Sequence, residues 1–404
     1  MGNEINRIKG GNICSPKGFT AGSIFAGIKS PGQDKKDIGI IFSETECVSA
    51  GTFTQNSVVS PSVTWTKQTL KDNKLQAVVV NSGCANCAVG DQGFIDAKET
   101  AEIASKSLSI SINSIAVAST GIIGVELPMA LMRKFIPKIE LSTKDGAGFA
   151  RSILTTDKRT KEIAVSFDLD GTEVTVAGVA KGSGMIHPNM ATMLSFITSD
   201  ISIDSNILKQ ALSESVNNSF NQISVDGDQS TNDTVLIMAN GKASNKKISS
   251  IEDSKRFINA LDEVCIFLAK EIAKDGEGNT RLIEASVKGA KTLNDARKAT
   301  KYIVSSNLVK TAVYGRDPNW GRIMMAVGAS QIELEESKIE IFVNDIQIVA
   351  DGIATPYNHQ SVVIAMNQPT IRLTVNLNIG EESAKAWGSE LTEEYVVFNS
   401  AYTT

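Results

Sequence analysis

Thr192 is a candidate nucleophile because of its position in the sequence. It follows a sparsely charged loop, residues 181–191, and it precedes an apolar run that begins at Met193. A strained loop would let the Thr192 hydroxyl attack the Ala191 carbonyl in an N-to-O acyl shift, and hydrolysis of the ester would leave Thr192 as a new N-terminus. A free α-amine, with a pKa of about 8, can act as the base for its own hydroxyl. The pattern alone does not justify this role, because a threonine at the start of a strand is nearly always an ordinary residue.

The small number of histidines limits other catalytic chemistries. The chain contains only His187 and His359, and zinc sites and Ser–His or Cys–His pairs draw on histidine. A nucleophile in this chain is therefore expected to use another base. Cys84 and Cys87 form a C-x-x-C pair, but no further ligands follow at zinc-finger spacing and no thioredoxin-like context surrounds them. We expect two small packing residues here and no metal site.

Three polar motifs have weaker functional signals. The Gly182–Gly184 triplet fits neither the Walker, nor the nucleophile-elbow, nor the dinucleotide pattern. Asp226–Ser230 resembles part of a calcium loop, but Thr231 occupies the position where an EF-hand requires glycine. The surrounding segment, 224–234, is either a solvated loop or a polar turn beside a pocket. Glu277 lies between two glycines and is either a surface charge or a partner for a cationic substrate group.

Composition and charge disfavour several classes of function. Of the 404 residues, 42% are hydrophobic and 21% are charged, as in an ordinary globular protein. A formal net charge of -5 without a Lys/Arg cluster argues against nucleic acid and membrane surfaces as partners. The sequence contains no run near the roughly 18 apolar residues of a membrane-spanning helix, and residues 1–14 lack the apolar core of a secretory signal. We expect a cytoplasmic protein that binds a small molecule or another protein chain.

The elements that position these residues are mixed strands and helices. Residues 161–182 alternate on either side of Asp170-Gly171, which predicts a β-hairpin leading into the candidate loop. Hydrophobic patterns predict further strands at 75–83, 114–124, 193–200, 234–241, 281–290, 339–352 and 370–380. Helical patterns occur at 94–108, 127–139, 206–220 (with Ser205 as its cap), 256–274, 292–302 and 381–388.

These elements do not follow a strict β-α-β order, so the pattern favours an α+β or layered α/β fold over a Rossmann sheet. A loose boundary near residue 280 divides the chain into a catalytic core, 1–280, and a C-terminal α+β domain, 281–404.

Several motifs together resemble the ornithine acetyltransferase family. The loop matches the family signature at 181–185 and 188–194. The other motifs that match, in family order, are NSGCANC (81–87), STGIIG (119–124), TTD (155–157), SVDGDQSTNDT (224–234), KDGEGNT (274–280), DPNWGRI (317–323) and NSAYTT (399–404). The resemblance spans nearly the whole chain, and Val89 departs from the threonine expected at that position.

The resemblance implies a reaction and a fold. The reaction is acetyl transfer from N2-acetylornithine to glutamate in arginine biosynthesis, by ping-pong steps through an acetylated threonine. The fold is a layered αββα-like sandwich with a smaller C-terminal α+β domain. No metal or nucleotide cofactor is implied. Some members also take the acetyl group from acetyl-CoA, so a bifunctional enzyme is expected.

The resemblance also assigns a nucleophile and an assembly. Thr192 matches the family nucleophile, which is created by self-cleavage after Ala191. The products, an α chain of residues 1–191 and a β chain of residues 192–404, would stay together and pair into an α2β2 heterotetramer.

The remaining site residues follow from the same matches. Thr120 and Gly121 match the oxyanion hole, as a hydroxyl and a backbone N–H. Substrate-contact positions are matched by Thr155, Lys181, Thr192, Glu277, Asn399 and Thr404. By charge, Lys181 and a hydroxyl such as that of Thr155 suit the substrate carboxylate. Glu277, or the C-terminal carboxylate of Thr404, suits the δ-ammonium of acetylornithine.

Two alternatives remain open. A self-cleaving aminopeptidase or amidohydrolase of the same fold would hydrolyse the acyl-enzyme with water, although the DPNWGRI and NSAYTT motifs favour acetyl transfer. A non-catalytic binding protein would keep the fold uncut, but it would have no reason to retain Thr192 after Ala191.

Overall fold

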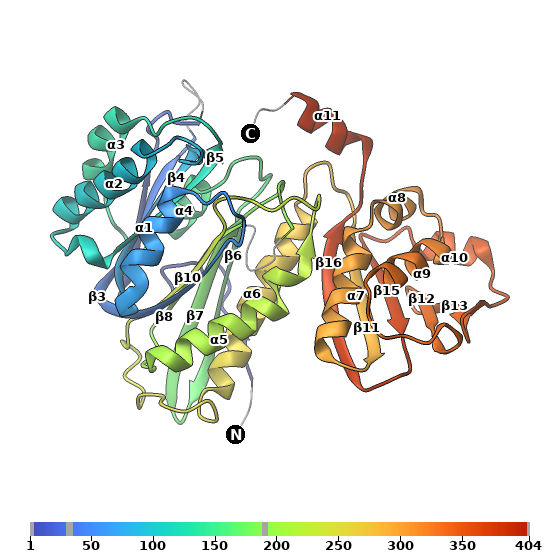
Figure 1. Ribbon diagram of the computed structural model, residues 1–404. Coiled ribbons are helices and arrows are strands. Elements are labelled where there is room, and N and C mark those ends of the chain that lie inside the picture. Colours follow the sequence, from blue (N-terminus) through green and yellow to red (C-terminus); the bar gives the residue numbers. More distant parts are fainter. Residues whose placement is uncertain (1–3, 30–34, 188–192, 402–404) are drawn as a thin grey trace.

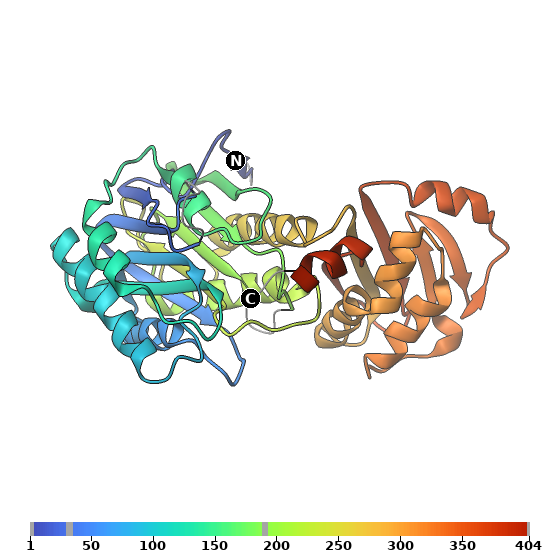
Figure 2. The same ribbon diagram turned by 90° about the horizontal axis from the view of Figure 1, so that it is seen from above.

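The computed structural model describes residues 4–29, 35–187 and 193–401. A larger body holds most of the first two thirds of the chain, through α6 (Lys255–Lys274), and a smaller body holds most of the last third (Figure 1). The C-terminal helix α11 (Glu393–Ala401) leaves the smaller body and returns toward the larger one in both views (Figures 1 and 2).

The larger body is built on a nine-stranded sheet with the order β1-β6-β7-β8-β10-β3-β4-β5, in which β2 also pairs with β3. Its strands are β1 (Asn6–Arg7), β2 (Phe19–Ile24), β3 (Ile38–Phe53), β4 (Lys74–Cys84), β5 (Ile115–Ile122), β6 (Lys161–Leu169), β7 (Thr172–Lys181), β8 (Leu194–Ser199) and β10 (Thr234–Ala239). β6 and β7 form the predicted hairpin, and its turn residues Asp170 and Gly171 both have positive φ.

The long strand β3 bends this sheet into two facing layers. Its first part pairs with β4, its last part pairs with β10, and the register shifts between Phe42 and Cys47. Alternate side chains then face different cores. Leu236 and Met238 of β10 belong to the core between the two layers, whereas Val235 belongs to the core on the opposite face.

Helices cover both outer faces of the bent sheet. α5 (Ser205–Asn218) and α6 (Lys255–Lys274) pack on the β6–β10 side. α1 (Pro61–Thr69), α2 (Gln92–Leu108) and α3 (Met129–Phe135) cover the β3–β5 side. α4 (Gly146–Ser152) adds Phe149 to the middle core. The αββα layering expected from the resemblance is therefore confirmed.

The smaller body is a seven-stranded sheet with the order β14-β13-β12-β15-β11-β16-β9. Its strands are β9 (Ile223–Ser224), β11 (Leu282–Ala290), β12 (Glu340–Val343), β13 (Ile346–Ala350), β14 (Ile353–Ala354), β15 (Thr370–Asn376) and β16 (Glu382–Ser389). Its helices are α7 (Leu293–Ser305), α8 (Asn307–Gly315), α9 (Trp320–Ala329) and α10 (His359–Ala365). Short 3-10 turns occupy Leu70–Asp72, Ile112–Ser114, Ile136–Lys138, Phe220–Gln222 and Glu336–Lys338.

Two local predictions were wrong. Residues 381–388 were expected to be helical, but Glu382–Ser389 form β16, because pairing with β11 on one side and β9 on the other outweighs the helix propensity of Glu, Ala and Lys. The α5 cap is Asp204 rather than Ser205, with the Asp204 side chain accepting a hydrogen bond from the Asn206 N–H. The division of the chain near residue 280 stays a prediction.

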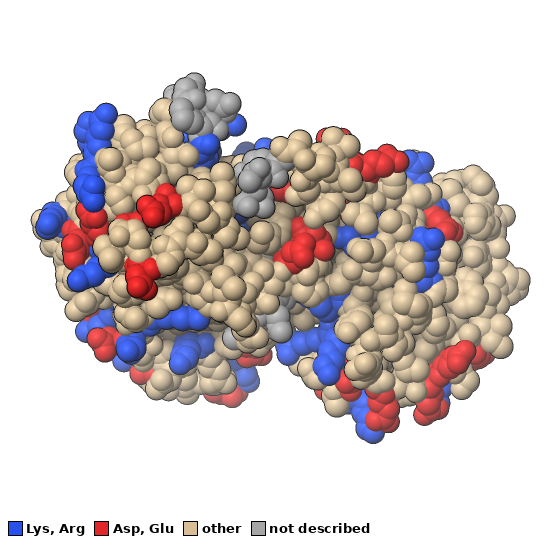
Figure 3. Space-filling model, turned by 45° about the horizontal axis from the view of Figure 1, so that its top comes forward, with Lys and Arg blue, Asp and Glu red and all other residues tan. Residues whose placement is uncertain are grey.

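The surface shows mixed charge. On the face in Figure 3, Lys and Arg side chains alternate with Asp and Glu over both bodies. Within the described ranges, none of the helices combines the length and the apolar character needed to cross a membrane.

Candidate active site

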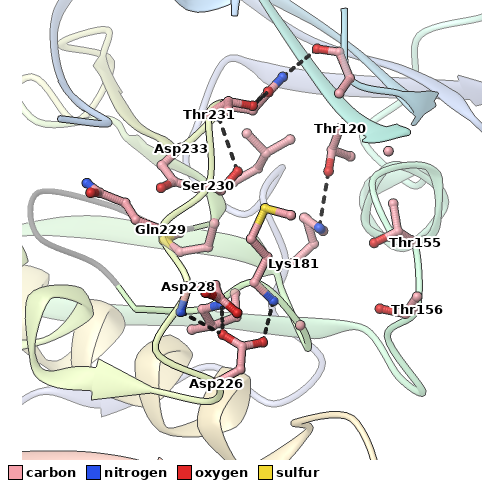
Figure 4. Close-up of a pocket in the computed structure, with 18 of the residues that line it drawn as sticks. Thr120, Thr155, Thr156, Lys181, Asp226, Asp228, Gln229, Ser230, Thr231 and Asp233 are labelled. Carbon is pink, nitrogen blue, oxygen red and sulfur yellow. Dashed lines mark hydrogen bonds between the residues drawn. The ribbon is translucent and has the colours of Figure 1, made fainter. Parts of the chain in front are cut away.

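A cavity of about 410 Å³ lies where loops from distant parts of the chain meet (Figure 4). All six predicted site residues that the structure describes line this cavity: Thr120, Gly121, Thr155, Lys181, Glu277 and Asn399. Ala191, Thr192 and Thr404 lie outside the described residues, but Met193 and Leu194, which follow Thr192 directly, also line the cavity.

The end of β5 supplies the predicted oxyanion-hole residues. β5 runs parallel to β4, and Gly121 lies beside Gly83 with a φ of 134°. A Cβ atom on Gly121 would lie 2.3 Å from the Gly83 carbonyl carbon, so this position requires glycine. The neighbouring Thr120 hydroxyl accepts a hydrogen bond from Lys181 Nζ at 3.2 Å.

Asn232 fixes this turn from the opposite loop, a role that the sequence motifs did not indicate. Its Nδ2 atom donates to the carbonyls of Ala85 and Ser119 at 2.6 and 2.8 Å. The Ser119 carbonyl belongs to the peptide bond that joins Ser119 to Thr120. The only sequence signal was the polar segment 224–234, which the structure places beside the pocket.

Lys181 ends β7 and is buried at the cavity wall. Burial lowers the pKa of the Lys181 ammonium, while the carboxylate of Asp157 acts in the opposite direction. A buried ammonium with a hydroxyl neighbour can bind a substrate carboxylate.

Glu277 and Asn399 form a second polar group in the cavity. Asn399 Nδ2, on α11, donates to Glu277 Oε2 at 2.9 Å, and the Glu277 N–H donates to the Ser183 carbonyl at 3.0 Å. A Cβ atom on Gly184 would lie 2.5 Å from both Glu277 carboxylate oxygens, so the absence of a side chain at Gly184 makes room for the carboxylate. The predicted partner for a cationic group is therefore buried in the cavity wall rather than exposed.

Asp226 anchors the loop that precedes Thr192. Its carboxylate accepts hydrogen bonds from the N–H groups of Met185 and Ile186 at 2.6 and 2.8 Å (Figure 4). The Val225 N–H also donates to the Ile186 carbonyl at 2.7 Å. Asp226 is the first aspartate of the segment that resembles a calcium loop. In this structure its carboxylate binds backbone N–H groups.

Strand pairing fixes both flanks of the candidate cleavage segment. Lys181 at the end of β7 pairs with Leu194 at the start of β8, and the Met193 carbonyl accepts a hydrogen bond from the Thr234 N–H at 2.9 Å. These contacts hold Met193 on one side of the segment, and Asp226 holds Ile186 on the other side.

Cys84 and Cys87 do not line the cavity, although the backbone of Cys84 pairs with Thr120. Both thiols are buried, and Cys84 Sγ donates to the Val125 carbonyl at 2.9 Å. In the part of the chain that the structure describes, no three His, Cys, Asp or Glu side chains group as a metal site would require.

The buried imidazole of His187 should make the free energy of unfolding depend on pH. Burial lowers the pKa of its imidazole to about 4, and Lys301 and Lys310 act in the same direction. The unfolded chain, with an ordinary His pKa of about 6.5, then binds more protons between pH 6.5 and 4, so stability is highest above pH 6.5 and falls as the pH drops through this window.

Urea unfolding tests this prediction on a Thr192→Ala variant, which should remain a single chain because it lacks the candidate attacking hydroxyl. His187→Gln in that background should remove a slope of up to about 1.4 kcal/mol per pH unit between pH 6.5 and 4. An identical pH dependence with and without His187 would contradict the assignment.

The chain is similar to known proteins over nearly its whole length. The profile of the ArgJ family matches residues 20–404. The arginine biosynthesis bifunctional protein ArgJ of Oceanobacillus iheyensis is 44% identical over 403 residues, covering 99% of this chain and 98% of the relative. The ArgJ protein of Dehalococcoides mccartyi is 43% identical over 405 residues, covering 100% of both chains. A crystal structure of ArgJ from Bacillus halodurans has 42% identity and a TM-score of 0.50, and it covers 51% of this chain and 98% of its own.

Proposed function

The chain belongs to the ArgJ family, and we propose that it transfers an acetyl group from N2-acetylornithine to glutamate through an acetyl-threonine intermediate. The observation that carries this proposal is the convergence of Thr120, Gly121, Lys181, Glu277 and Asn399 on one cavity beside the start of β8. These residues come from four separate parts of the chain.

The reaction follows from the groups in the cavity. The Thr192 hydroxyl attacks the acetyl amide carbon, and the Thr192 α-amine takes the hydroxyl proton. The Thr120 hydroxyl and the Gly121 N–H stabilise the tetrahedral oxyanion. The C–N bond then breaks, the departing nitrogen receives the proton, and ornithine leaves an acetyl ester on Thr192. The α-amine of glutamate then attacks the ester carbonyl carbon, the bond from that carbon to Thr192 Oγ breaks, and the Thr192 α-amine passes the proton of the attacking nitrogen to Oγ. N-acetylglutamate leaves, and Thr192 is free again.

The α-amine becomes available through cleavage of the Ala191–Thr192 bond. The Bacillus halodurans ArgJ chain matches over nearly its full length and yet covers about half of this chain. A chain of that length is what cleavage near the middle would produce, which supports the proposal.

The sheet gives a physical reason for the two products to remain together. β7 would belong to the α chain and β8 to the β chain, and the two strands pair antiparallel from Val176–Ser199 to Lys181–Leu194. β10 pairs with β8 on one edge and with β3 on the other. Separation would break this sheet and expose two apolar cores, so the products should separate only on unfolding.

Incubation with acetylornithine in the absence of glutamate tests the proposal. We expect the fragment that begins at Thr192 to gain the mass of one acetyl group, and added glutamate to remove it with formation of N-acetylglutamate. Release of free acetate at a comparable rate without glutamate would instead indicate the amidohydrolase alternative.

Four further features complete the proposal. Acetyl-CoA serves as a second acetyl donor, which the word bifunctional in the names of full-length relatives supports. Acetyl-CoA should acetylate Thr192 in the absence of acetylornithine.

The α and β chains pair into an α2β2 heterotetramer, and light scattering of the untagged protein would measure its mass. The reaction draws on protein groups alone, and the enzyme acts in the cytoplasm.

Glu277→Gln should separate the two substrates. We assign Glu277 to the δ-ammonium of acetylornithine, a group that glutamate lacks. Loss of this charged contact should raise the KM for acetylornithine about 10-fold to 100-fold, with a smaller change for glutamate. Steady-state kinetics with each substrate varied would measure this, and Glu252→Gln at an exposed ion pair is the control. Equal changes in both KM values would contradict the assignment.

A further inference from the structure

A buried ion cluster lies directly behind the cavity. Lys161 Nζ donates to Asp157 Oδ1 and to Asp275 Oδ2, each at 2.6 Å. The side chains of Lys161 and Asp157 have no exposed surface, and that of Asp275 is 4% exposed. Lys161 does not line the cavity itself.

The two carboxylates of the cluster are connected to different segments of the cavity wall. Asp157 Oδ1 also accepts the Gly182 N–H at 2.7 Å, directly after Lys181, and Asp157 Oδ2 accepts the Thr155 N–H at 3.1 Å. Asp275 follows α6 and stands two residues before Glu277. One ammonium group therefore connects the segments that carry Thr155, Lys181 and Glu277.

Stability alone is a weak reason for this arrangement. Removing three charged groups from water costs free energy that their mutual attraction only partly offsets, and apolar residues of similar volume would often serve equally well. An ion cluster with short, directed hydrogen bonds adds a fixed geometry between its partners.

We propose that Lys161 is a positioning residue for the substrate site, acting through Asp157 and Asp275 to set the separation of Thr155, Lys181 and Glu277. The inference rests on the proposed function, because it assumes that these three groups bind the substrates. Lys161 touches neither substrate nor the reacting atoms.

Three variants test this role: Lys161→Met, Lys161→Arg, and Val327→Ala in the core of the smaller sheet. Val327→Ala is the control for destabilisation, since it opens a cavity far from the site. Intact mass and thermal unfolding would first show that each protein is folded and cleaved. Calorimetry with ornithine and with glutamate would then give dissociation constants that do not depend on turnover.

Lys161→Met should raise the dissociation constants of both ornithine and glutamate about 10-fold to 100-fold. The reason is that Thr155 and Lys181 face the carboxylate that the two ligands share. Lys161→Arg should restore most of the affinity, and Val327→Ala should bind both ligands as the wild type does. If Lys161→Met fails to fold, the double variant Lys161→Met/Asp275→Asn, which keeps the charge balance, should show the same weakening.

Two results would overturn the inference while leaving the proposed function intact. One is a folded Lys161→Met or double variant that binds both ligands normally. The other is an equal loss of affinity in Val327→Ala. A wild-type protein that binds neither ornithine nor glutamate would overturn both the inference and the proposed function.

Discussion

Thr192→Ala is expected to leave a single chain of 43.1 kDa and to abolish acetyl transfer. Alanine removes the hydroxyl that attacks the Ala191 carbonyl, so cleavage cannot start and no α-amine is released. The same change removes the nucleophile of the transfer reaction, so both steps fail together. Denaturing mass spectrometry and an acetyl-transfer assay would measure the two effects on one preparation.

Thr192→Ser is the matched control, because serine keeps a hydroxyl at the same position. It should still cleave and should retain measurable transfer. A Thr192→Ala protein that separates into two fragments, or that transfers acetyl groups at the wild-type rate, would contradict the role of Thr192.

Thr120→Val should lower kcat by about 10²-fold to 10³-fold, the usual effect of removing one oxyanion donor. Valine has nearly the shape of threonine but no hydroxyl, and the KM values should change less than kcat. Lys181 Nζ also loses a hydrogen-bond acceptor, so kinetic constants for both substrates should be measured and normalised to the cleaved fraction.

Thr198→Val controls for the loss of a buried threonine hydroxyl. Thr198 Oγ1 donates to the Ile13 carbonyl at 2.7 Å in the middle core, and it does not line the cavity. This variant should lose stability but keep its kcat. A Thr120→Val enzyme with a kcat as high as that of Thr198→Val would contradict the oxyanion role.

Elements with a strong local pattern could be predicted from the sequence. The hairpin of β6 and β7 follows from alternation around Asp170-Gly171, and α6 follows from its long amphipathic repeat. β16 was misassigned because its strand state depends on β11 and β9, which lie far from it in the sequence. The bend in β3 is also a tertiary effect, since its two parts pair with strands that follow it at very different separations.

In the candidate site too, residues in local motifs could be predicted from the sequence, whereas residues that act through distant contacts could not. The residues expected to contact substrate were found through motifs that resemble a family, and the structure brings those it describes to one cavity. Asp157, Asp226 and Asn232 were not assigned roles, because each acts on backbone groups of a distant segment. Lys161 resembled any other lysine that begins a strand, and only its burial against two carboxylates distinguishes it.

The most direct measurement of the central claim is the mass of the purified, untagged protein under denaturing conditions, together with its N-terminal sequences. The account predicts two fragments of similar size, one of which begins Thr-Met-Leu-Ser-Phe, so that Thr192 is a free N-terminal nucleophile. A single chain of 43.1 kDa that nevertheless transfers acetyl groups would contradict it, because the Thr192 amine would then be part of a peptide bond and could not act as the base.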